Sequence, residues 1–184
     1  MKVFVGLVLL MFFTACLKSE KTKKPLVSNF IKREIERLNV EKPSVIKVAI
    51  MNGKIDTVVS DSLDWSEELN VFLANDVDSS QLVNYSHSTT SDVRCLRDTV
   101  PPCYSYVCDI FHALNAEEKI QNVKIWSLNQ KIRDIEIIVQ KQHELFTYYK
   151  KLIYHVQKGY EISGSQDIKF MEGINYKVTV VYSN

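Results

Sequence analysis

Residues 44–60 carry the clearest alternation of apolar and polar positions in the chain. An Asn-Gly pair at positions 52–53 interrupts the alternation, and this dipeptide favours the type I′ turn of a β-hairpin because both turn residues need positive φ. The pattern therefore predicts a hairpin whose register is fixed by the turn. Pairing about the turn places these residues on one face: Ile46, Val48, Ile50, Ile55, Thr57 and Val59.

Two segments have the periodicity of amphipathic helices. From Pro25 to Asn39, apolar residues recur at helical spacing opposite a face of mixed charge, which predicts a surface helix rather than one lying on a membrane. Asp64-Trp65-Ser66-Glu67 has the pattern of a capping box and predicts a second helix to about Asn75. We expect Asp76, which follows in a polar stretch, to be a solvated loop residue.

The second half of the chain has the period of β-strands. Residues 82–87 and 103–114 also favour strands, whereas 88–102 favour a loop because Pro101-Pro102 cannot lie in a central strand. Connections this short force antiparallel neighbours. We therefore expect an α+β fold: an antiparallel β-meander that can curl into a half-barrel, packed by two helices, with an N-terminal β-hairpin. The later strands are predicted at 120–128, 131–141, 145–157, 160–170 and 173–182.

The first residues have the composition of an export signal. Lys2 precedes an uncharged apolar run from Val3 to Phe13, which as a helix spans only about half of a ~30 Å hydrocarbon core. This length favours a signal peptide over a membrane-spanning helix. Phe13-Thr14-Ala15-Cys16 resembles a bacterial lipobox, in which the cysteine thiol is acylated and the chain is cut before it. The alternative is a plain signal peptide with an incidental cysteine.

Three parts of the chain follow from this interpretation. Residues 1–15 form a lipoprotein signal peptide, residues 16–25 a lipidated flexible tether, and residues 26–184 a single α+β domain. Two or more acyl chains anchor a protein stably, so we expect attachment to a membrane through acylated Cys16. Lipoproteins exported to the bacterial cell surface tend to carry an acidic run just after the cysteine, whereas here Glu20 stands alone among the lysines of the tether. The comparison implies an outer-membrane location facing the periplasm rather than the cell surface.

Charge and cysteine content narrow the functional classes. The formal net charge is +1, so the chain as a whole has no strong electrostatic attraction to nucleic acid. Three cysteines remain beyond Cys16, and outside the cytoplasm a disulfide can persist. Cys95 and Cys103 flank a short loop whose closure would contribute about 2–3 kcal/mol, and we expect this disulfide with Cys108 buried. The three lack the spacing of a zinc site.

No catalytic motif is present in the sequence. Serine-hydrolase elbows, zinc-protease motifs, phosphate loops and dinucleotide fingerprints are all missing. Asp134 and Glu136 lie two residues apart on one predicted strand face, which we interpret as a solvated outer face with Ile135 and Ile137 pointing inward. We expect no enzyme activity, no cofactor and no metal. Four histidines lie on separate predicted elements: His87, His112, His143 and His155.

Aromatic residues share one parity on several predicted strands. They could line a groove for an acyl chain or form a contact surface, and the alternative is that they are the core beneath the helices. The residues of this candidate face are Trp126, Phe146, Tyr148, Tyr154, Tyr176 and Tyr182.

Two stretches together resemble a group of uncharacterised Bacteroidota lipoproteins. The first is Asp64-Trp65 with Glu68-Leu69, Phe72 and Asp76, and the second is Lys158-Gly159-Tyr160-Glu161-Ile162-Ser163-Gly164 with Gln166. The resemblance covers most of the chain after Cys16 and implies no activity. The order of helices and strands is also similar to the half-barrel of lipoprotein carriers, a likeness of fold alone.

Two functions remain open from the sequence. The first is a lipid-anchored envelope protein that binds a protein partner or builds an assembly without catalysis. The second is an anchored carrier or sensor of an apolar ligand, such as a lipid, held in a curved sheet. An apolar cavity larger than ~300 Å³ inside the sheet would favour the carrier, whereas a filled interior with an exposed apolar patch would favour the protein partner.

Overall fold

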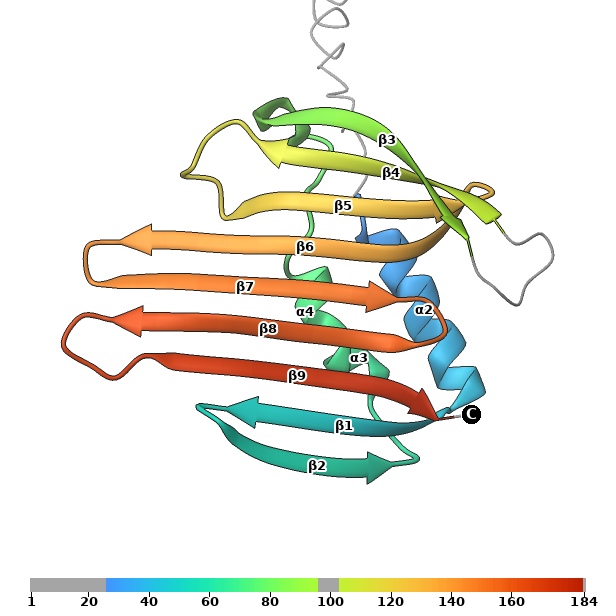
Figure 1. The fold of residues 1–184 in the computed structure, drawn as a ribbon, viewed down its shortest axis with the longest axis horizontal. Helices are drawn as coiled ribbons and strands as arrows, with labels where there is room; N and C mark the ends of the chain where they lie inside the picture. The colour runs from blue at the N-terminus through green and yellow to red at the C-terminus, as the bar shows by residue number, and fades with distance from the viewer. Residues whose placement is uncertain (1–25, 96–102, 184) are drawn as a thin grey trace, which may run out of the picture.

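All strands of the chain that the structure describes belong to one antiparallel sheet (Figure 1). The structure is a computed structural model and describes residues 26–95 and 103–183. The spatial order of the nine strands is β2-β1-β9-β8-β7-β6-β5-β4-β3. The strands are β1 Ser44–Met51, β2 Lys54–Ser60, β3 Tyr85–Cys95, β4 Cys103–Ala113, β5 Ile120–Leu128, β6 Lys131–His143, β7 Phe146–His155, β8 Gly159–Ile168 and β9 Ile174–Ser183. The predicted α+β meander with its N-terminal hairpin is confirmed, and the sheet does not close into a barrel.

The helices lie behind the sheet in Figure 1 and cover the part of that face nearer its right end. The predicted N-terminal helix begins at Ser28 rather than Pro25. The second predicted helix is broken at Leu69 into two short helical segments. No helix among the described residues is both long and apolar enough to cross a membrane. The helical elements are α2 Ser28–Glu41, α3 Trp65–Glu68, α4 Asn70–Leu73 and the 3₁₀ turn η2 Leu82–Asn84.

The hairpin of β1 and β2 has the predicted register. Ile50 lies opposite Ile55, and Ile46 lies opposite Val59. Asn52 and Gly53 both have positive φ, as a type I′ turn requires. Strand β1 also pairs with β9 along its length, so the hairpin forms one edge of the sheet.

The prediction of a loop at 88–102 is wrong for residues 88–95. Strand β3 runs from Tyr85 to Cys95 and pairs with β4 without a break in register. It is an edge strand with only one neighbour, so its many serine and threonine side chains need not fill a core.

The hydrophobic core lies between the helices and the sheet. Ile135, Ile137 and Leu152 point toward the helices and are fully buried. Phe72 of α4 meets the rings of Tyr154 and Tyr160 edge-on, with ring centres 5.8 and 6.1 Å apart. Aromatic rings prefer this arrangement, and it fixes the helices on the sheet. The opposite face of the sheet, which we call the open face, carries no helix of the described chain.

Candidate functional site on the open face

The aromatic residues singled out from the sequence do not lie on one surface. Tyr154 is fully buried and Tyr182 packs edge-on against Trp65, so both belong to the core. Phe146, Tyr148 and Tyr176 lie on the same face of the sheet as Tyr154, whereas Trp126 lies on the open face. A single aromatic groove containing all six side chains is therefore not formed.

Glu136 is the centre of a row of charges that crosses the open face. Its carboxylate lies 3.0 Å from Nζ of Lys124 on β5 and 2.9 Å from Nζ of Lys151 on β7. The side chain is 11 % exposed, so the predicted solvated carboxylate is wrong for this residue. Burial alone would raise the pKa of Glu136, but the two lysine hydrogen bonds outweigh it and hold the pKa below its ordinary value.

Asp134 lies on the same face as Glu136, and its partner is a histidine. Oδ1 of Asp134 is 2.5 Å from Nδ1 of His155 on β7. Ile135 and Ile137 point to the core as predicted. Both carboxylates on this strand are therefore held by cross-strand neighbours, which is the arrangement of a structural charge ladder.

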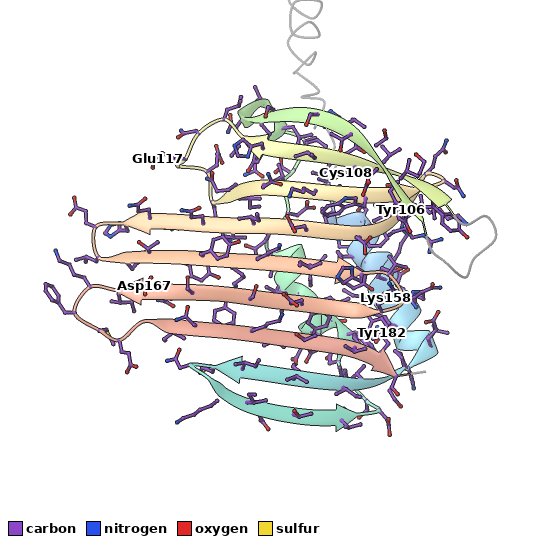
Figure 2. All side chains as sticks on the ribbon, viewed as in Figure 1. Tyr106, Cys108, Glu117, Lys158, Asp167 and Tyr182 are labelled. Atoms are coloured by element: carbon purple, nitrogen blue, oxygen red, sulfur yellow. The ribbon has the colours of Figure 1, made fainter. Side chains whose placement is uncertain are left out.

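A recess lies beside this ladder, toward the right-hand end of the open face, where Figure 2 labels Tyr106 and Lys158. One cavity of about 570 Å³ and another of about 270 Å³ share Tyr106, Asp134 and Lys158 in their linings. We define the recess by the side chains that give it its chemistry: Tyr104, Tyr106, Trp126, Arg133, Asp134, His155 and Lys158. Aromatic rings next to charged groups suit a ligand that has both an apolar part and a polar or charged part.

The recess contains two cations that are not neutralised. The register shifts between Trp126 and Ser127, so that Arg133 is an extra residue on β6, as in a β-bulge. The Nε of Arg133 is buried and has no hydrogen-bond partner among the described residues. Neither Arg133 nor Lys158 forms an ion pair within that part of the chain. Neither residue was predicted as a site residue. The bulge that contains Arg133 has no signal in the alternation pattern, and Lys158 was noted only within the motif at 158–166.

A second region of the open face is aliphatic. Ile46 pairs with Val59 on one side and with Val181 on the other, so these side chains are adjacent across three strands. Ile55 and Val59 on the edge strand are both 69 % exposed. We call this region the aliphatic surface: Ile46, Val48, Ile50, Ile55, Val59 and Val181. A contiguous exposed apolar area of this kind is typical of an interaction surface.

The histidines lie apart from one another, as the sequence suggested. His87 stacks on Phe111 with ring centres 4.5 Å apart and lies 3.0 Å from the carboxylate of Asp109. His143 stacks on Phe146. No group of three or more histidine, cysteine, aspartate or glutamate side chains that could hold a metal occurs in residues 26–95 and 103–183.

The structure tests only some of the predictions made for the cysteines. Cys16 lies outside the described residues. The backbone register places Cys95 directly opposite Cys103 in neighbouring strands, but the side chains of both lie outside the description, and the disulfide stays a prediction. Cys108 is buried, as expected.

Several polar side chains beneath the helices hold the two layers together through hydrogen bonds that the sequence did not predict. The hydroxyl of Tyr154 donates to Glu34 at 2.8 Å. The Tyr160 hydroxyl donates to Glu68, which also accepts from Lys47 at 2.7 Å. Burial raises the pKa of Tyr160, and the bond to Glu68 raises it further. These groups therefore form a buried structural network.

Comparison of the chain with protein-family models, with curated proteins and with solved structures finds no match.

Proposed function

We propose that this protein is a lipid-anchored component of a bacterial cell envelope that binds a protein partner through the aliphatic surface, without catalysis. The observation that carries the proposal is the contrast between the two faces of the sheet. Toward the helices, the apolar side chains are packed in a filled core, whereas on the open face Ile55 and Val59 are exposed beside Ile46. Exposed apolar area of this extent favours a protein partner.

Co-purification from envelope membranes tests the partner. Full-length tagged protein carrying Ile55→Lys is compared with Val58→Lys, because Val58 lies on the same strand, is 51 % exposed, and faces the other side of the sheet. Burying a lysine in an apolar contact is costly. We expect Ile55→Lys to lower recovery of the partner about tenfold and Val58→Lys to leave it unchanged. Equal recovery from both variants would contradict face-specific docking.

The anchor rests on the uncharged run from Val3 to Phe13 followed by Thr14-Ala15-Cys16. Cells grown with labelled palmitate should label the wild-type protein and a Cys103→Ser control but not Cys16→Ser. Label that persists in Cys16→Ser would refute acylation at this residue. The outer-membrane, periplasm-facing location and the kinship with Bacteroidota lipoproteins are parts of the same proposal, supported by the tether composition and by the motifs at 64–76 and 158–166.

The recess favours a second candidate function, the binding of a small ligand. Its rings match the apolar part of the ligand foreseen from the sequence, but Arg133 and Lys158 require that the ligand also carry a polar or anionic group. Native mass spectrometry of the detergent-extracted protein should then reveal a bound molecule that is lost in Lys158→Ala and kept in Lys54→Ala. A purely apolar lipid retained by all three proteins would support an apolar-ligand carrier instead.

A further inference from the structure

Three connections between strands lie toward the left end of the sheet in Figure 1: β6–β7, β8–β9 and β1–β2. The backbone N–H of Lys169 in the β8–β9 connection donates to the carbonyl oxygen of Leu145 in the β6–β7 connection at 2.9 Å. In the β1–β2 turn, the side-chain Nδ2 of Asn52 donates to the carbonyl oxygen of Gly173 in the β8–β9 connection at 3.5 Å, and its Oδ1 accepts from the N–H of Asn175 at 2.8 Å. The three connections therefore form one fixed end of the molecule, which we call the tip.

The tip holds large apolar side chains out in solvent. Phe170 is 92 % exposed, and Met171, Leu145 and Met51 are each more than half exposed. Phe170 also has a φ of 68°, a backbone conformation that bulky residues rarely adopt. The turn is closed by a hydrogen bond from the Met171 N–H to the Ile168 carbonyl oxygen at 3.0 Å. The fold thus keeps an aromatic ring exposed at the cost of backbone strain, which is a common feature of functional sites.

The charges around these side chains balance. Nζ of Lys169 lies 5.4 Å from the centre of the Phe170 ring, and Nζ of Lys141 lies 5.9 Å from that of Phe146. Glu144 and Glu172 stand in the same two connections. Lys54 follows the β1–β2 turn, and the carboxylate of Asp167 lies against Gly173 of the β8–β9 connection. Three cations against three anions give the tip no net charge, so we expect its contacts to depend on its apolar side chains.

We propose that the tip inserts its apolar side chains into the surface of the bilayer that carries the acylated Cys16. The inference rests on the proposed anchor. A tether of residues 16–25, fully extended, reaches about 35 Å, which is close to the length of one ten-residue strand of the sheet. A tether of this length therefore allows the tip to contact the bilayer. Phenylalanine and leucine side chains of interfacial segments bury into the boundary between headgroups and acyl chains. Phe170, Met171 and Leu145 project from turns, where they can enter this boundary without bending the sheet.

Photo-cross-linking to lipid tests this contact. The full lipidated chain is reconstituted into phosphatidylethanolamine vesicles that contain a lipid with a photoactivatable acyl chain, and cross-linked peptides are identified by mass spectrometry. We expect cross-links at residues 144–145 and 169–172. Phe170→Asn should lower them about tenfold, as expected from the loss of a buried phenyl group, and Val83→Asn, at an exposed valine away from the tip, should not.

The same experiment separates the possible failures. Asparagine tolerates positive φ, so Phe170→Asn should unfold no earlier than the wild type, and lost cross-linking cannot be ascribed to misfolding. Cross-links confined to residues 16–25, or unchanged in Phe170→Asn, would overturn the proposal for the tip. A cross-linking yield that rises with anionic lipid and falls at high salt would overturn it as well, since the tip has no net charge. A peptide containing unacylated Cys16 would instead refute the anchor.

Discussion

At the scale of single residues, Glu136 shows how the open face is stabilised. It is a carboxylate nearly removed from water, and two lysines from the neighbouring strands compensate for its burial. The lysines themselves are about one-third exposed, so solvent screens part of the attraction. Because strands β5, β6 and β7 are joined by this one group, its charge state affects the stability of the sheet.

Glu136→Gln should lower the free energy of unfolding by about 1–2 kcal/mol at neutral pH, because two lysines lose their common partner. The folded-state pKa of Glu136 lies below its ordinary value. The contribution of this carboxylate is therefore present above about pH 4.5 and is lost as the pH falls through the lower folded-state pKa. Urea unfolding from pH 7 down to pH 3 measures both effects.

Glu161→Gln provides the control for that measurement. Glu161 makes one ion pair, with its carboxylate 2.8 Å from Nζ of Lys177. Glu161 is more exposed than Glu136, and Lys177 is more exposed than either lysine that contacts Glu136. Its replacement should cost less, and the wild type and Glu136→Gln should converge in stability at low pH. A difference between these two proteins that persists undiminished at pH 3 would contradict the assigned role.

The orientation of Glu136 could be predicted from the sequence, but its burial could not. Alternation along β6 correctly placed Ile135 and Ile137 in the core and the carboxylates on the other face. Whether a carboxylate on that face is solvated depends on which residues lie opposite it on two other strands. The residues opposite Glu136 are determined by the pairing register of the strands. Counting back from the β5–β6 turn gives the wrong partner, because the register shifts between Trp126 and Ser127.

At the scale of elements, turns determine where strands begin and how they pair. Gly159 begins β8 with a φ of 130°, and a Cβ there would lie 1.9 Å from the carbonyl oxygen of Val180. Gly53 in the β1–β2 turn has a φ of 81° and open space around it. A side chain at Gly53 would therefore meet backbone strain alone, whereas a side chain at Gly159 would meet both strain and a steric collision.

Gly159→Ala should lower the free energy of unfolding by more than about 2 kcal/mol, since strain and a backbone collision add. Gly53→Ala should lower it by only about 1 kcal/mol, from strain alone. Thermal and urea unfolding of both variants check the ranking. The account of this turn would be wrong if both variants lost the same stability.

Helix α2 depends on a residue distant in sequence. The carboxylate of Asp76 accepts hydrogen bonds from the N–H groups of Val27 and Ser28, at 2.9 and 2.8 Å, where the first turn has no partners of its own. Asp76→Ala should therefore cost about 1 kcal/mol, whereas Asp56→Ala, at an exposed position on β2, should cost little. Equal unfolding free energies for Asp76→Ala and the wild type would show that this cap is dispensable.

The β3–β4 pair provides a further prediction at this scale. Opposite residues in antiparallel strands have Cα atoms about 4.5–5.5 Å apart, within the range that a disulfide requires. Since Cys95 lies opposite Cys103, we expect intact protein to gain two hydrogens in mass on reduction. Cys95→Ser should lower stability by about 2–3 kcal/mol. An unchanged mass on reduction would exclude the bond.

Sequence patterns predicted most elements because each signal was local. The Asn-Gly turn fixed the hairpin register, and Asp64 begins α3 by accepting from Ser66 and Glu67. Strand β3 was missed in part because an edge strand needs no apolar alternation. The cap from Asp76 was missed for another reason: it joins residues about fifty positions apart, which no local pattern records.

At the scale of the whole molecule, the two faces of the sheet differ: the hydrophobic core lies on one face, and the candidate binding surfaces lie on the other. One face carries the helices, which cover the part nearer its right end in Figure 1, and the core beneath them, while the open face presents the aliphatic surface and the recess in different places. The tip is at one end of the strands, and the recess lies toward the other (Figures 1 and 2). A protein held to a bilayer by its tip would leave the open face accessible to a partner.

The central claim is that a partner docks on the aliphatic surface of the anchored protein. Photo-cross-linking in intact cells tests it most directly, with a photoreactive amino acid placed at position 55, at position 59 or at position 58. We expect the same envelope protein to be captured from positions 55 and 59 and not from position 58, whose side chain points to the other face. Capture that is equal from all three positions, or from none, would contradict the claim.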